Sequence, residues 1–168
     1  MLLIGLVFHV IQFRFVLYPI QVNIQGKTFY AVSFDVARYS SVVRGTTGFF
    51  TMNVPFADGG PQITEQFLQE KDRALFSSQK AYIFTPEAGK AFLYAVRNVL
   101  GSLWMMLFYT LFVLAAAFHG FNGIWTFLAR WGIIVSSRNL RVCQILCYIG
   151  MCIVMAMGVS VIWNMYLL

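Results

Sequence analysis

The sequence predicts an all-α membrane protein with three transmembrane helices and a long polar loop between the first and the second. Apolar residues make up 60% of its 168 residues and charged residues only 11%, whereas about a quarter of the residues in a soluble domain are charged. Three long apolar stretches are visible, and most of the charge lies between the first two. The predicted boundaries are 1–20, 99–128 and 142–168 for the helices, 21–98 for the polar loop and 129–141 for a short loop.

The second and third apolar stretches are the clearest spans. Each exceeds the roughly 20 residues that cross a hydrocarbon core of about 30 Å. The stretch 99–128 contains no acidic or basic side chain except His119, and 142–168 is interrupted only by Gln144, Ser160 and Asn164. Both are therefore predicted to cross the bilayer.

The first stretch, 1–20, is apolar but contains Gln12 and Arg14 and has no polar flank before it. A signal peptide is the alternative interpretation, but it requires a basic start and a small-residue cleavage site. Neither is present, so the pattern favours a spanning helix whose N-terminal end is missing.

The polar region 21–98 holds all six acidic residues and eight of the twelve basic ones. Its alternation predicts a short strand at 28–34, and its apolar spacing predicts a helix at 61–76. Thr85-Pro86-Glu87 is typical of a helix start, with a hydroxyl cap followed by proline. We expect that helix to continue into the second span.

Charge predicts the orientation and excludes one class of partner. The loop 129–141 contains Arg130, Arg138 and Arg141 without an acidic residue, and short Arg-rich loops remain in the cytoplasm. The region 21–98 is then extracytoplasmic. The net charge of +6 does not indicate nucleic-acid binding, because the basic residues are scattered.

The chain has two histidines, His9 and His119, and both lie in apolar stretches. An ionisable side chain inside a span is costly and is a functional candidate, and imidazole is the usual axial ligand of haem in a helical bundle. A flat macrocycle needs small residues beside its ligand. Gly5 lies four residues before His9, and Ala115, Gly120 and Gly123 lie within four residues of His119. A histidine hydrogen-bonded to a neighbouring helix is the alternative.

Depth along the helices separates the two histidines. At 1.5 Å per residue, His119 lies about 16 Å before Arg130 and His9 about 16 Å before Ile20. Because the two helices run in opposite directions, the imidazoles belong to opposite halves of the bilayer. They are therefore predicted to serve two different b-type haems, each of which needs a second axial ligand from elsewhere.

The stretch 118–133, with His119, Asn122-Gly123 and Trp131-Gly132, followed by the last span, resembles the C-terminal part of the five-helix, di-haem cytochrome b that anchors succinate dehydrogenase and fumarate reductase in the membrane. The stretch 6–14 around His9 looks like that family's third helix. The resemblance implies that His9 serves the distal haem and His119 the proximal one. The family's first two helices, with their two ligands, have no counterpart here, and the loop 21–98 is longer than the family pattern.

The resemblance also implies partners and a mechanism. Flavoprotein and iron–sulfur subunits exchange electrons with succinate or fumarate, the haems carry these electrons, and a membrane quinone is the other redox partner. The chain would be a non-catalytic or quinone-site subunit, embedded among the lipids of the bacterial cytoplasmic (inner) membrane. Arg14 and Arg130 are candidates to pair with haem propionates, or simply extend to the membrane interface.

Two rival interpretations remain open. One is a small polytopic transporter or channel component with intramembrane histidines, although the residues leading to His119, 111–117, are all apolar. The other is a truncated product that binds nothing. Independent catalysis is not expected, because no phosphate loop, nucleophile elbow or zinc-ligand spacing occurs.

Overall fold

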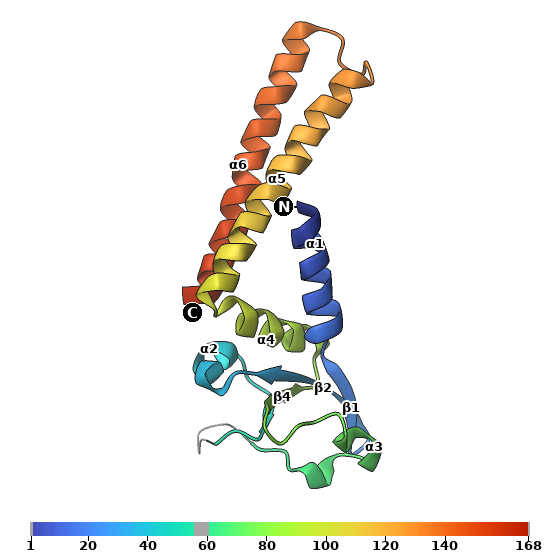
Figure 1. Cartoon of the computed structure of the whole chain (residues 1–168), viewed down its shortest axis with the longest axis vertical. Coiled ribbons are helices and arrows are strands. Elements are labelled where there is room, and N and C mark those ends of the chain that lie inside the picture. Colours follow the sequence, from blue (N-terminus) through green and yellow to red (C-terminus); the bar gives the residue numbers. More distant parts are fainter. Residues whose placement is uncertain (1, 56–60, 168) are drawn as a thin grey trace. The chain divides into compact units, whose positions relative to one another are not determined.

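The computed structural model describes residues 2–55 and 61–167, except for the side chain of Glu65. Contacts divide the chain into two compact units (Figure 1). One consists of residues 8–102 and contains a β-sheet, and we call it the sheet unit. The other consists of residues 2–7 and 103–167, and we call it the helical unit.

The sheet unit contains four antiparallel strands in the order β1-β2-β4-β3. Their bounds are Ile20–Ile24 for β1, Lys27–Phe34 for β2, Phe50–Met52 for β3 and Ala81–Thr85 for β4. The expectation of an all-α chain is therefore wrong. The short strand expected at 28–34 is present as part of β2.

Strand β4 explains why the sheet forms. All five of its residues are buried, so it has apolar neighbours on both faces. Phe84 joins a cluster with Val22, Ala31 and Met52 on one face, whereas Ile83 packs with Tyr94 of helix α4, Ala88–Leu100, on the other. The β1–β2 turn has positive φ angles at Gln25 and Gly26, as in the type I′ turn that matches the twist of a hairpin.

Short helices complete the sheet unit, and three expectations about them are wrong. Residues 61–76 form no single helix, but only a 3-10 turn at Glu65–Phe67 and the short helix α3 at Glu70–Arg73. Helix α4 begins only at Ala88, with Glu87 at the N-cap position, because Thr85, the expected hydroxyl cap, is the last residue of β4. It also ends at Leu100 instead of continuing into the next span. The remaining elements are a 3-10 turn at Val36–Arg38 and helix α2 at Tyr39–Val43.

The helical unit contains two antiparallel helices, α5 at Leu103–Arg130 and α6 at Ser137–Leu167 (Figure 1). They pack through glycines of α6. A Cβ atom on Gly150 would lie 2.7 Å from the ring of Phe121, and one on Gly158 would lie 2.5 Å from Val113 Cγ1. Gly150 and Gly158 therefore let α5 approach closely, as small residues do in membrane helix pairs.

Both long helices are apolar enough to cross a membrane, yet little of either is buried. The buried share of the most apolar window is 17% for α5 and 11% for α6. An exposed apolar surface of this extent is typical of helices that face lipid or further helices. The two helices thus match the second and third predicted spans, with shifted ends.

The first helix is shorter than the expected span 1–20. It consists of α1, Leu2–Val10, followed by a π-helical segment at Ile11–Val16, and strand β1 already begins at Ile20. At 1.5 Å per residue, an α-helix over 2–16 would extend about 22 Å, less than the hydrocarbon core of about 30 Å. Among the described residues, two helices pass the length test for a span, and a third is not confirmed.

Candidate functional site

His119 lies on the outward surface of α5. Its side chain is exposed, as are Gly120 and Gly123, whereas Ala117 two residues earlier is buried. No hydrogen bond from the imidazole to another described residue is present. The alternative interpretation, a histidine hydrogen-bonded to a neighbouring helix, therefore finds no such bond between His119 and α6.

The surface beside His119 is open enough for a flat ligand. A Cβ atom added to Gly120 or to Gly123 would meet no atom within 4 Å. The polar groups nearby are already paired within α5: Trp125 Nε1 donates to Asn122 Oδ1 at 3.1 Å, and the Thr126 hydroxyl donates to the Asn122 carbonyl at 2.8 Å. The residues present thus leave room for a macrocycle held by His119.

Arg130 lies in the last turn of α5 and is exposed. A cationic side chain is favourable there, because the carbonyl end of a helix carries partial negative charge. It lies eleven residues, or about 16 Å, along the helix from His119. The Arg130 side chain would therefore have to bend back along the helix to approach a group bound at His119.

His9 lies at the end of α1, where the helix changes to π geometry. The Leu17 N–H donates to the Gln12 carbonyl, five residues earlier, at 2.8 Å. In a π-helix residues five apart share a face, and such segments occur frequently at functional sites. The sequence pattern of residues 11–16 gives no indication of this π-helical segment.

The end of α1, the π-helical segment and α4 together surround an open pocket of about 340 Å³ with aromatic rings and one guanidinium. Its lining residues are His9, Val10, Phe13, Arg14, Tyr18 and Phe92. The rings of His9 and Phe13 are 5.1 Å apart, and the Arg14 guanidinium lies 4.7 Å above the Tyr18 ring. The sheet unit therefore brings two predicted site residues, His9 and Arg14, to the same pocket, whereas His119 and Arg130 belong to the helical unit.

Gly5 does not provide the room that was expected beside His9. A Cβ atom on Gly5 would overlap the ring of Phe112, which already fills that space. Gly5 thus serves the contact between α1 and α5 in the helical unit. Small neighbours therefore leave room for a flat ligand beside His119, whereas the space at Gly5 beside His9 is filled.

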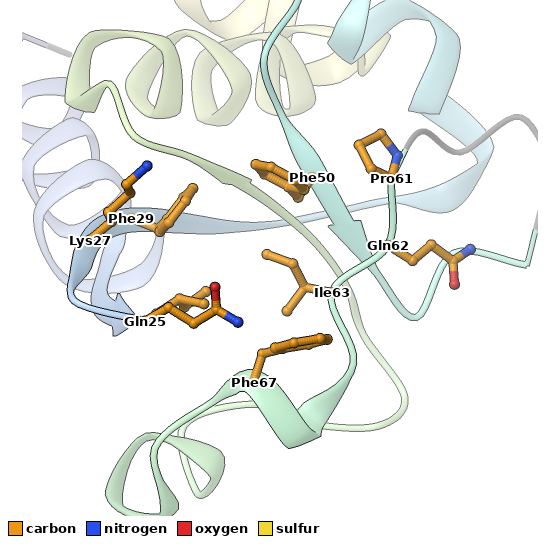
Figure 2. A pocket seen from close by; sticks show the side chains of 9 residues that line it. Gln25, Lys27, Phe29, Phe50, Pro61, Gln62, Ile63 and Phe67 are labelled. Atoms are coloured by element: carbon orange, nitrogen blue, oxygen red, sulfur yellow. The ribbon is translucent and has the colours of Figure 1, made fainter.

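A second pocket, of about 330 Å³, lies on the sheet unit and has no counterpart in the sequence analysis. Figure 2 shows the side chains of Gln25, Phe29, Phe50, Ile63 and Phe67 arranged around it. The rings of Phe29 and Phe50 meet edge to face with centroids 5.7 Å apart. Only the chain fold could reveal this pocket, because its residues come from three separate segments.

The described residues contain no group of three or more His, Cys, Asp or Glu side chains that could hold a metal ion. This result does not bear on haem, whose iron takes only its axial ligands from protein.

The comparisons with known proteins give one partial match. No protein-family model and no solved structure matches the chain. Over 45 residues it is 44% identical to the succinate dehydrogenase cytochrome b558 subunit of Bacillus subtilis (strain 168). The matched segment covers 27% of this chain and 22% of that protein. The match thus spans about a fifth of its curated relative. Together with the two apolar helices, it indicates a membrane protein that is similar in part to the cytochrome b subunit of succinate dehydrogenase.

Proposed function

We propose that the chain is a membrane-anchor and electron-transfer subunit of a succinate:quinone oxidoreductase in the bacterial cytoplasmic membrane. The observation that carries the proposal is the 44% identity over 45 residues to a succinate dehydrogenase cytochrome b subunit. Flavoprotein and iron–sulfur subunits are the proposed soluble partners, and a membrane quinone is the proposed redox partner. The loop 129–141 would face the cytoplasm and the region 21–98 the opposite side.

His119 and His9 are the proposed axial ligands of two b-type haems. A bound haem would supply one-electron transfer between the iron–sulfur subunit and quinone. The chain's own contribution is to ligate the iron, orient the ring and exclude water from it. The exposed imidazole of His119 beside two glycines with open Cβ positions supports ligation there, because an unpaired imidazole in a bilayer is costly.

Arg14 and Arg130 are proposed to pair with haem propionates, with Arg14 the better supported of the two. It lines the same pocket as His9 and is held over the Tyr18 ring. An Arg guanidinium offers two parallel N–H donors to a carboxylate. A propionate in this pocket would compete with the ring face for the same cation.

The geometry gives no support to the transporter interpretation. A path for ions or protons needs polar side chains in succession along a helix. On α5, however, the Thr110 hydroxyl donates to the Met106 carbonyl at 2.8 Å and Thr126 donates to Asn122. Both hydroxyls therefore bond within their own helix.

Reduced-minus-oxidised spectra of the purified, assembled complex test the proposal. The wild type should show b-type bands, and His119→Ala should lose the part contributed by its haem while the complex still assembles. Thr110→Ala, which removes a polar group from the same helix, is the matched control and should leave the spectrum unchanged. An unaltered spectrum in His119→Ala, or a wild-type complex without porphyrin, would overturn the haem assignment.

A further inference from the structure

The first two turns of α6 carry positive charge that no acidic residue of this part of the chain balances. Arg138 and Arg141 lie three positions apart, and both are exposed. No Asp or Glu follows Glu87 in the sequence. Neither guanidinium forms an ion pair or hydrogen bond with another described residue, so both are available to an anion from outside the chain.

These arginines border a pocket of about 420 Å³ with two chemically different ends. Ser137, Arg138 and Arg141 provide polar and cationic groups at the start of the helix, and Val142 and Ile145 provide aliphatic groups one turn later. An occupant that satisfies both ends has an anionic head joined to an alkyl body.

The aliphatic end continues down the helix as an exposed stripe. Val142, Ile145, Ile149 and Ile153 recur every three or four positions and are 52%, 52%, 53% and 54% exposed. Gly150 and Gly158, which contact α5, lie on another side of α6. From Val142 to Ile153 the stripe extends about 16 Å, and exposed apolar side chains continue beyond it at Met157 and Val161.

We propose that this face of α6 binds an anionic phospholipid. Arg138 and Arg141 hold the phosphate, and the acyl chains lie along the stripe from Val142 to Ile153. The exposed aliphatic side chains directly beside two unpaired arginines are the reason for choosing a lipid over a soluble phosphate. Basic residues on the cytoplasmic side of a transmembrane helix bind anionic lipid head groups by the same charge complementarity. The proposal rests on α6 crossing a bilayer, but not on haem.

Native mass spectrometry of the full chain, with any subunits that copurify, tests the proposal in mixed micelles of phosphatidylcholine and phosphatidylglycerol. The wild type should retain phosphatidylglycerol in excess. Arg138→Gln and Arg141→Gln should each lower this excess about fivefold, which corresponds to about 1 kcal/mol per basic side chain. The control Arg44→Gln/Lys80→Gln removes two positive charges from the sheet unit, as many as Arg138→Gln/Arg141→Gln removes from α6, and should retain the excess.

Three results would overturn the proposal. The first is an unchanged phosphatidylglycerol excess in Arg138→Gln/Arg141→Gln. The second is displacement of the lipid by equimolar glycerol phosphate, which would identify a site for a soluble phosphate. The third is release of the soluble subunits from Arg138→Gln/Arg141→Gln with no change in the number of bound lipids, which would identify a protein-binding face. Absence of porphyrin alongside a retained lipid preference would refute only the proposed haem function.

Discussion

The open surface around Gly123 leads to a sharp prediction about haem. Gly123 lies four residues after His119 on α5, and a Cβ atom there would meet nothing within 4 Å. In Gly123→Leu, the new side chain would occupy the surface that a macrocycle ligated by His119 must cover. We therefore expect Gly123→Leu to eliminate the haem at His119 while the α5–α6 pair remains folded.

The structure also predicts how Gly123→Leu changes the stability of the folded chain. Glycine inside a helix is destabilising by roughly 0.5–1 kcal/mol relative to alanine, so Gly123→Leu should leave the stability unchanged or raise it by about that amount. Gly158→Leu is the matched control, a glycine-to-leucine change on α6 for which a loss of stability is expected. Its Cβ would lie 2.5 Å from Val113 Cγ1, and overpacking of this kind costs about 1–3 kcal/mol.

Haem content and thermal unfolding should be measured on the same preparations of the assembled complex. Gly123→Leu should reduce the haem-to-protein ratio. After haem removal, its melting temperature should not fall below that of the wild type treated in the same way, whereas that of Gly158→Leu should. Full haem content in Gly123→Leu would refute the assignment of this surface. A fall in melting temperature equal to that of Gly158→Leu would show that Gly123 is a packing residue.

Two further predictions concern the sheet unit, and chemical denaturation monitored by hydrogen exchange of β2 and β4 would check both. Phe84→Ala should destabilise this unit by about 3–5 kcal/mol, because Phe84 is 0% exposed, and the half-exposed Phe67→Ala should have little effect. Arg97→Gln should lower the stability of this unit by about 1.5–3 kcal/mol, because Arg97 Nη1 donates to the carbonyls of Val42 and Arg44 at 3.1 and 2.7 Å. Equal protection from exchange in the variant and the wild type would contradict this prediction.

The sheet was largely missed in the sequence because of how its central strand is buried. Residues 81–85 have apolar neighbours on both faces, so they lack the alternation that marks a strand with one wet face. Their partner β2 lies about fifty residues earlier, with Tyr30 opposite Thr85. Pairing across such a separation depends on tertiary contacts that local propensity does not contain. The alternating strand β2, by contrast, was partly predicted.

The breaks in the helices were missed for a related reason. Gly101 and Ser102 separate α4 from α5, yet a single glycine does not by itself end a helix. The Arg38 guanidinium stabilises the end of α4 by donating to the Asn98 carbonyl at 2.6 Å. The Asn98 side chain accepts from the Asp35 N–H at 3.1 Å. These contacts come from residues sixty positions away, so the boundary could be found only once the sheet unit had folded.

The candidate ligands, by contrast, could be found from sequence because their signal is local. A histidine in an apolar stretch is conspicuous wherever the chain folds, and the neighbours one turn away share its face by helical geometry alone. What sequence could not show is which small neighbours remain available: Phe112 fills the space beside Gly5, whereas the surface beside Gly123 is open. This difference makes His119 the stronger of the two candidate ligands. It also makes α5 the helix on which a second ligand from outside the chain should converge, because its open glycine surface and its unpaired imidazole lie on the same side.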